Sequence, residues 1–135
     1  MNPRYIGLIL AALAVAFFVY RQYGQAGPDG TTAVSAAQAQ AELAADPDIR
    51  VLDIRTPAEY AEGHIRGALN IDFLGADFAK RLGELDRDAT YLVYCRSGNR
   101  SARAMKVFGQ LGFTRVLHLS RGIRDWQQQG GPLVK

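Results

Sequence analysis

The sequence predicts an α/β protein with a parallel sheet flanked by helices on both faces, preceded by one N-terminal apolar helix. After residue 31, short β-prone apolar runs alternate with segments of helical periodicity. Such alternation is typical of a parallel sheet that is covered on both sides. The uncharged stretch 5–20 stands apart, because a glycine-rich segment follows it.

Composition places the chain among ordinary globular proteins. Its 135 residues suffice for one domain, and hydrophobic residues make up 48% and charged residues 21%. A disordered or fibrous protein is therefore not expected. The formal net charge of +3 is small and basic residues are mixed with acidic ones, so no nucleic-acid partner is expected.

Residues 1–23 are predicted to form a membrane anchor, since Arg4 and Arg21 bracket the uncharged stretch 5–20. A helix over this stretch spans roughly 24 Å, and flanking arginines and tyrosines make up part of the shortfall from the roughly 30 Å hydrocarbon core. A cleaved secretory signal is the alternative, because Gly24-Gln25-Ala26 has the small residues that a signal peptidase reads. The expected location is a membrane with a single-pass N-terminal anchor, and the side of the membrane on which the rest of the chain lies stays open.

Residues 24–31 are predicted to be a flexible linker, because glycine and proline recur there. The remaining domain covers residues 32–135. Its first helix is expected to begin after Ser35, which stands at capping-box spacing from Gln38, and to run to about Ala45.

Three short apolar runs are expected to be strands, at 49–54, 68–71 and 91–94. Between them, Pro57 can open a helical turn, and the apolar face of 74–85 predicts a longer helix. In a parallel sheet the ligand site lies at the carboxyl ends of such strands.

The last elements follow the single cysteine. An amphipathic helix is expected to end at Gly112, since apolar residues recur at helical spacing up to that point. A strand at 115–119 and a helix at about 122–129 complete the domain, and the helix is expected to bury Ile123 and Trp126.

Cys95 carries the strongest functional signal in the chain, because it stands directly between the strand 91–94 and the amphipathic helix. This order aims backbone N–H groups and the positive end of a helix at one sulfur, which favours a thiolate and any anion bonded to it. A single cysteine excludes an internal disulfide and argues against an all-thiolate metal site. No metal and no cofactor is expected.

The loop after Cys95 contains the groups that an anionic sulfur site needs. Its glycine can take the positive φ of a tight turn, its arginines can hold an oxyanion, and its serines and asparagine can donate hydrogen bonds. The candidate binding residues are Arg96, Ser97, Gly98, Asn99, Arg100 and Ser101.

Two other interpretations of Cys95 are weaker. A solvated loop that merely contains a cysteine would not need the strand and the helix that flank it. A protease-like pair would need His64 or His118 as its base, and no local pattern supports either.

Four segments, taken together and in this order, resemble a single rhodanese-like domain over about 32–135. They are 51–55 followed by Glu59-Tyr60, 63–68 followed by Asn70 and Ile71, 94–101, and 122–126. The resemblance implies a parallel sheet flanked by helices and a sulfurtransferase activity. In such an activity a thiolate accepts a sulfane sulfur, for instance from thiosulfate, and passes it to a thiol or cyanide.

The resemblance also implies roles for individual residues. Cys95 is the sulfur carrier, the amides of 96–101 surround the terminal sulfur, and Arg100 closes the loop. Arg96 is the arginine for the donor's sulfonate, whereas Arg121-Gly122 departs from a pair of glycines found in many members and leaves donor choice open. The positions that resemble supporting or structural ones are Asp53, Arg55, His64 and Trp126.

Two alternatives stay open at this point. Cysteine phosphatases, including dual-specificity enzymes that share the fold, place five residues between cysteine and arginine, whereas this chain has four, 96–99; a phosphatase or arsenate reductase is thus the weaker reading. A rhodanese-like module that exchanges sulfur only with a protein partner is the stronger one. The expected partners are a small anionic sulfur donor, a thiol or cyanide acceptor, a sulfur-carrier protein, and the membrane through residues 5–20.

Overall fold

The computed structural model describes residues 5–7, 9–15 and 29–135. Residues 5–7 and 9–15 are helical, and most of the predicted anchor and linker lies outside the described residues. Within the described part of the chain, no helix has both the length and the apolar character needed to cross a bilayer.

Five parallel strands form one sheet in the order β1-β5-β4-β2-β3. They are β1 (Thr31–Val34), β2 (Arg50–Asp53), β3 (Leu69–Asn70), β4 (Thr90–Tyr94) and β5 (Arg115–Leu119). The chain leaves β2 towards one edge of the sheet and leaves β4 towards the other. The carboxyl ends of β2 and β4 therefore border the crevice in which open parallel sheets bind ligands.

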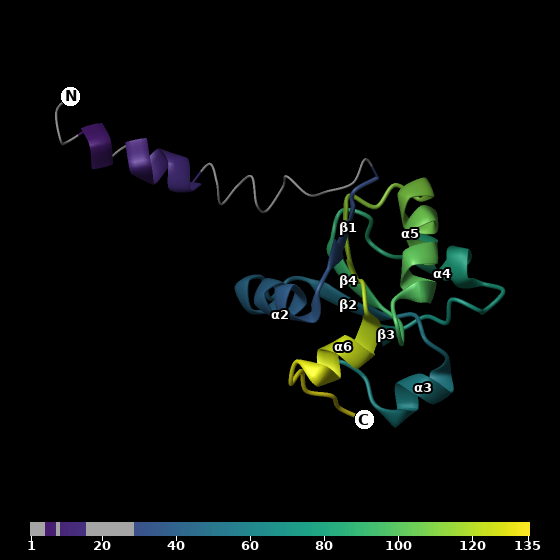
Figure 1. Ribbon diagram of the computed structural model, residues 1–135. Helices are drawn as coiled ribbons and strands as arrows, with labels where there is room; N and C mark the ends of the chain where they lie inside the picture. The colour runs from purple at the N-terminus through teal and green to yellow at the C-terminus, as the bar shows by residue number, and fades with distance from the viewer. Residues whose placement is uncertain (1–4, 8, 16–28) are drawn as a thin grey trace.

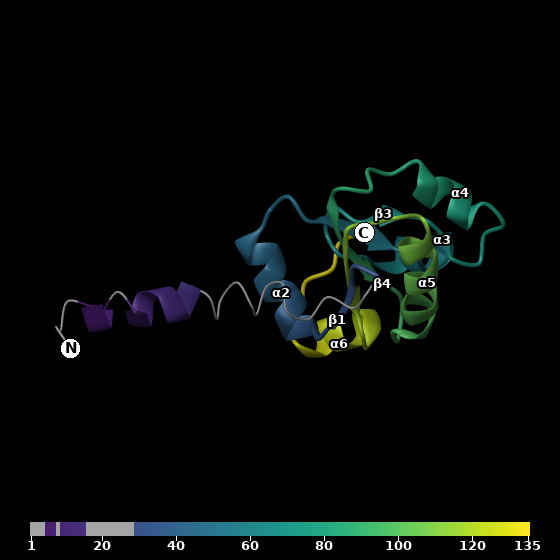
Figure 2. The same ribbon diagram turned by 90° about the horizontal axis from the view of Figure 1, so that it is seen from above.

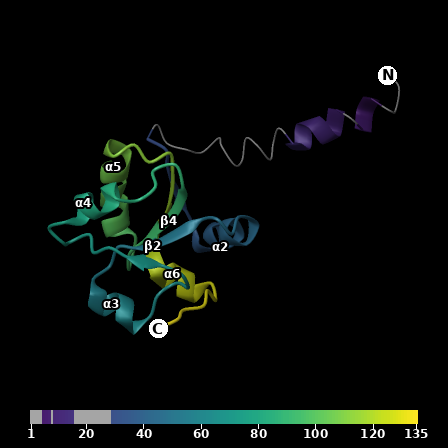
Figure 3. The ribbon, with the colours of Figure 1, turned by 180° about the vertical axis from the view of Figure 1, so that it is seen from behind.

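Helices cover both faces of this sheet, as Figures 1 and 2 show. They are α2 (Ala36–Ala45), α3 (Pro57–Glu62), α4 (Phe78–Gly83), α5 (Asn99–Gln110) and α6 (Gly122–Gln128). Helices α2 and α6 pack on one face, and α4 and α5 pack on the other. The predicted fold class is confirmed for the domain. Figure 3 shows α3 and α6 at the same end of the sheet.

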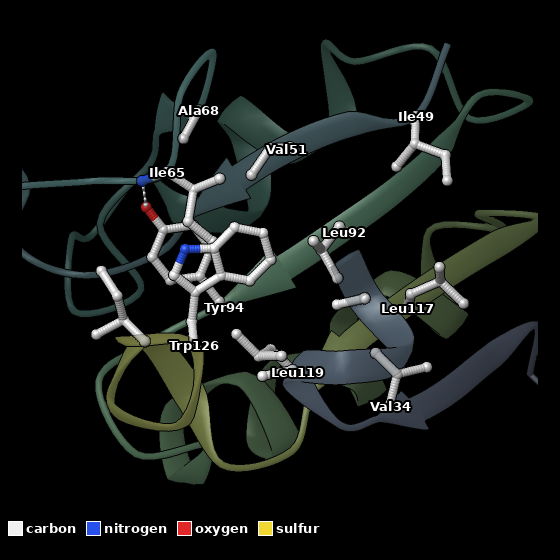
Figure 4. Close-up of a cluster of buried hydrophobic side chains, with 13 residues drawn as sticks. Val34, Ile49, Val51, Ile65, Ala68, Leu92, Tyr94, Leu117, Leu119 and Trp126 are labelled. Atoms are coloured by element: carbon white, nitrogen blue, oxygen red, sulfur yellow. Dashed lines mark hydrogen bonds between the residues drawn. The ribbon is translucent and has the colours of Figure 1, made fainter. Parts of the chain in front are cut away.

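Alternation of side chains along the strands divides the core into two clusters. On β4, Leu92 and Tyr94 point to the face covered by α2 and α6, where they join the cluster in Figure 4. Tyr91, Val93 and the following Cys95 belong to the cluster beneath α4 and α5. Burial on both faces is typical of a central strand in a parallel sheet. The alternation of side chains along β4 therefore places Cys95 on the face of the sheet that α5 covers.

Two elements differ from the sequence-based expectation. The predicted helix over 74–85 begins only at Phe78, because the Asp72 carboxylate accepts a hydrogen bond from the Leu74 amide (2.9 Å) and forms a local turn instead. Strand β1 is not predicted from the sequence, since Val34 is the only buried residue of its four. Its place is set by pairing with β5, a long-range contact.

Candidate active site

Cys95 is the first residue after β4, and its sulfur faces the start of α5. The Sγ atom accepts hydrogen bonds from the backbone amides of Gly98 (3.2 Å) and Ser101 (3.4 Å). Helix α5 has no side-chain N-cap, so the sulfur acts as the acceptor for a first-turn amide that would otherwise lack one. Two amide donors and the helix dipole together favour negative charge on this sulfur.

Two glycines allow the cysteine loop to lie against the connection between β5 and α6. Gly98 has φ +95° and Gly122 has φ +66°. A Cβ atom on Gly98 would collide with the carbonyl oxygen of Ser120, and one on Gly122 would collide with that of Arg96. Glycine is therefore required at both positions for conformational and for steric reasons.

The thiol is buried in the core cluster beneath α4 and α5, and its sulfur is hydrogen-bonded to polar groups of its own loop. Cys95 is 1% exposed, and beyond the two amides it donates to the Ser101 hydroxyl at 3.6 Å. That hydroxyl donates to the Gly98 carbonyl (3.1 Å) and lies 3.1 Å from Nδ1 of His118. Burial lowers the pKa of His118 from its ordinary value of 6.5. The sulfur thus has polar hydrogen-bond partners at a position that is otherwise part of the apolar core.

Arg100 is held by an acid on α3. Its Nη1 and Nη2 atoms donate to the two carboxylate oxygens of Glu59, at 2.9 and 2.8 Å. Glu59 also forms a capping box with Thr56 at the start of α3. The hydrogen bonds from Arg100 are the main cause that lowers the pKa of Glu59 to about 2. This bidentate pair ties α3 to the first turn of α5.

Asp53 and Arg55 form a buried network at the end of β2. The Arg55 Nε and Nη2 atoms donate to the Asp53 carboxylate at 3.0 and 2.7 Å. The Tyr94 hydroxyl donates to the same carboxylate at 2.7 Å and accepts the Ile65 amide at 3.0 Å, the bond drawn in Figure 4. Burial, and then the Asp53 charge, raise the pKa of Tyr94, so its hydroxyl keeps the proton that it donates. The network joins the carboxyl ends of β2 and β4.

A pocket of about 410 Å³ opens beside the cysteine loop, between α3 and α6. Three arginines contribute to its lining, Arg55, Arg96 and Arg124, together with Glu59 and Glu62. The carbonyl of Arg96 accepts the Arg124 amide at 3.3 Å, which fixes the loop against α6. The balance of charges favours an anionic ligand near Arg96.

The remaining predicted residues lie at the surface or in the core. Ser97 is exposed on the loop, Asn99 is exposed at the first position of α5, and Arg121 is exposed just before α6. His64 stacks on a tyrosine ring, and Trp126 is buried. In the part of the chain that the structure describes, no group of three or more His, Cys, Asp or Glu side chains is arranged to hold a metal ion.

Three residues around the site received no role from the sequence. Glu59 could have been found from the Thr56-x-x-Glu59 capping-box spacing, although that spacing does not reveal Arg100 as its partner. Tyr94 and His118 carry no local signal, because their partners come from distant segments of the chain.

The fold and the loop together define an α/β protein with a cysteine at the carboxyl edge of its sheet, whose sulfur accepts hydrogen bonds from two backbone amides. Residues 35–129 match the family model described as the rhodanese-like domain. The chain belongs to the rhodanese-like family.

Relatives agree with this assignment. A sulfurtransferase from Allochromatium vinosum is 41% identical over 92 residues, which cover 68% of this chain and 84% of the relative. Thiosulfate sulfurtransferase GlpE from Pseudomonas aeruginosa is 38% identical over 92 residues, covering 67% and 81%. The crystal structure of a rhodanese-related protein from Thermoplasma volcanium has a TM-score of 0.67 and 32% identity, covering 76% of this chain and 96% of that one.

Proposed function

We propose that this chain transfers a sulfane sulfur from thiosulfate or a persulfide donor to a thiol or cyanide acceptor, with Cys95 as the carrier. The observation that carries the proposal is the pair of amide hydrogen bonds to Sγ at the start of α5. These donors stabilise a thiolate before the reaction and a persulfide anion after it. The relative named thiosulfate sulfurtransferase supports thiosulfate as one donor.

The first half-reaction loads the sulfur. The Cys95 thiolate attacks the sulfane sulfur of thiosulfate, and a new S–S bond forms at Sγ. The S–S bond within thiosulfate breaks, and sulfite leaves with the electron pair. Charge is conserved, because a thiolate and a dianion become a persulfide anion and a dianion.

The second half-reaction unloads the sulfur. The acceptor, for example cyanide, attacks the terminal sulfur of the persulfide and forms a C–S bond. The S–S bond at Cys95 breaks, thiocyanate leaves, and the thiolate is restored. No cofactor takes part in either half-reaction.

We assign the surrounding residues by their contacts. Arg96 lines the pocket beside the loop, and its guanidinium suits the sulfonate of the donor. Arg100 is held by Glu59 and keeps the loop closed beside the cysteine. Asp53 and Arg55 hold the strand ends in register and do not react. Ser97 and Asn99 are exposed, and we assign them as further hydrogen-bond donors to the incoming sulfur donor.

The test is a thiosulfate:cyanide sulfurtransferase assay on the full chain, with thiocyanate as the product measured. We expect Cys95→Ser to abolish thiocyanate formation and Arg96→Ala to raise the KM for thiosulfate with a smaller effect on kcat. Full activity of Cys95→Ser would overturn the proposal. An aryl phosphate serves as the counter-substrate, and we expect no hydrolysis of it.

A second candidate is sulfur exchange with a protein partner alone. The observation that favours it is the 1% exposure of Cys95, which restricts access to donors whose terminal sulfur can be inserted into the loop. The two candidate functions predict different rates of sulfur transfer from a small donor, so the chain is assayed with thiosulfate and with a protein persulfide as donors. A strict partner requirement predicts activity with the second donor only.

We further propose that residues 5–20 anchor the protein in a membrane, because this stretch is uncharged between Arg4 and Arg21. The test is alkaline carbonate extraction of membranes from cells that express the full chain. We expect the chain to stay with the membrane at full length. Release of a chain shortened near residue 26 would support the cleaved signal instead.

A further inference from the structure

The Ser101 hydroxyl lies between the Cys95 sulfur and the His118 imidazole. Its oxygen is 3.6 Å from Sγ, which donates to it, and 3.1 Å from Nδ1 of His118. Ser101 is fully buried at the start of α5, and His118 is partly buried on β5. The sulfur-transfer steps above give His118 no part, although the hydroxyl connects it to the reacting atom.

We propose that Ser101 and His118 form a proton relay for the Cys95 thiol, an inference that rests on the proposed sulfurtransferase function. Ser101 touches the reacting sulfur and is the catalytic member of the relay. His118 acts through it and is a positioning residue that accepts and returns the proton.

The relay balances without any other reagent. The S–H bond of Cys95 breaks as its proton passes to Ser101 Oγ, and the O–H proton of Ser101 passes to Nδ1 of His118. The products are a thiolate and an imidazolium. In the resulting state Nδ1–H donates to Ser101, and the Ser101 hydroxyl donates to the sulfur, which then has a third donor beside its two amides.

When His118 is in the tautomer that carries its proton on Nε2, the hydroxyl proton of Ser101 has two acceptors within reach, and this permits the relay. The Gly98 carbonyl lies 3.1 Å from Ser101 Oγ, and Nδ1 of His118 lies at the same distance. Rotation about the C–O bond moves the proton from one acceptor to the other without moving the buried side chain. The carbonyl satisfies the hydroxyl in the resting state.

The residues paired with His118 on the neighbouring strands carry no charge that would fix the protonation state of its imidazole. Its neighbours across the sheet are Ala33 on β1 and Val93 on β4, neither of which is charged. On α5, Arg103 and Lys106 are exposed, whereas Arg100 interacts electrostatically with Cys95. Burial alone lowers the pKa of His118, so the imidazole is neutral at neutral pH in the resting state. The imidazolium of the product state is disfavoured by burial and depends on the nearby thiolate for its stabilisation.

The second histidine provides a matched control. His64 lies outside this chain of contacts, because its ring stacks on Tyr60 with centroids 3.7 Å apart and its Nδ1 is 2.9 Å from the Tyr60 carbonyl. The chain contains only these two histidines and one cysteine. The thiolate signal therefore comes from Cys95 alone, and the two histidines can be replaced one at a time.

The experiment follows the ultraviolet absorbance of the thiolate against pH in the full chain, with Cys95→Ser subtracted as the baseline. We expect His118→Asn to move the rise of the thiolate signal upward by about one pH unit, a tenfold lower ratio of thiolate to thiol at a given pH. Ser101→Ala should also move it upward, and Ser101→Thr should restore it. His64→Asn should leave it in place.

A double-mutant comparison distinguishes the relay from a merely structural role of His118. His118→Asn must have no further effect in a Ser101→Ala background, because the hydroxyl is the only link in the relay. Equal shifts in both backgrounds, or an unchanged profile in folded His118→Asn, would overturn the relay. If His118→Asn fails to fold, the contrast between Ser101→Ala and Ser101→Thr decides, and identical profiles for the two refute it.

This titration needs no turnover. A wild-type chain that never gains sulfur from a donor would overturn the proposed function, and the thiolate profile would still report on the relay. The two failures are therefore distinguishable.

Discussion

The carboxylate of Glu59 accepts two parallel hydrogen bonds from the guanidinium of Arg100, at 2.8 and 2.9 Å. The pair joins two elements that share no sequence neighbourhood, the first turn of α3 and the first turn of α5. Its two side chains are 25% and 20% exposed, so solvent weakens the interaction only in part. It fixes the direction of an arginine that would otherwise be free to leave the loop.

Replacing Glu59 with Gln should lower the free energy of unfolding by about 1 to 2 kcal/mol at neutral pH. Because Arg100 lowers the pKa of Glu59 from 4.5 to about 2, the contribution is complete above pH 4.5. It is lost as the pH falls through about 2. Urea unfolding at several pH values measures the difference between the two proteins.

Glu62→Gln is the control for this prediction, since Glu62 is exposed on the same helix. It should change the free energy of unfolding much less at every pH. A Glu59→Gln effect that stays constant between pH 7 and acid conditions would contradict the assignment to the ion pair.

The buried network of Asp53, Arg55 and Tyr94 predicts two different costs. Tyr94→Phe removes one hydroxyl and leaves the Ile65 amide unpaired, which should cost about 1 to 3 kcal/mol. Asp53→Asn leaves the buried Arg55 charge without its counter-ion, which should cost about 3 to 5 kcal/mol. Chemical unfolding measures the loss in free energy of unfolding for both variants. A smaller loss for Asp53→Asn than for Tyr94→Phe would refute this prediction.

Gly98→Ala should disrupt the cysteine loop. Its φ of +95° disfavours any side chain, and its Cβ would in addition collide with the Ser120 carbonyl. We expect a loss of about 3 kcal/mol or more, with loss of sulfur transfer. Thermal unfolding and the thiocyanate assay measure the two effects.

Gly130→Ala separates conformational strain from collision. Gly130 has φ +76°, and a Cβ there would have open space around it. This variant should lose only about 1 to 2 kcal/mol and keep its activity. Equal losses in free energy of unfolding for Gly98→Ala and Gly130→Ala would show that the collision with the Ser120 carbonyl does not contribute.

The position of the cysteine could be predicted from local sequence, because the order of strand, loop and helix is encoded within a few residues. The positive φ of Gly98 and the capping box at Ser35 are local as well. Both are confirmed. Local turn chemistry also explains why α4 is shorter than predicted, since Asp72 competes with helix formation.

The partners of these residues could not be predicted, because they depend on strand order and register. His118 meets Ser101 since β5 pairs with β4 in a register that sets His118 beside Val93. Glu59 meets Arg100 since α3 lies at the carboxyl end of the sheet, beside the loop. Neither relationship has a signature in the separate segments.

The central claim is that the sulfur of Cys95 accepts and holds another sulfur atom. It is tested most directly by intact-mass analysis of the full chain after incubation with thiosulfate, followed by cyanide. We expect a gain of one sulfur atom, located on Cys95 by peptide mapping and removed by cyanide. A chain whose mass is unchanged by thiosulfate or by a protein persulfide, or a gain that persists in Cys95→Ser, would contradict the account.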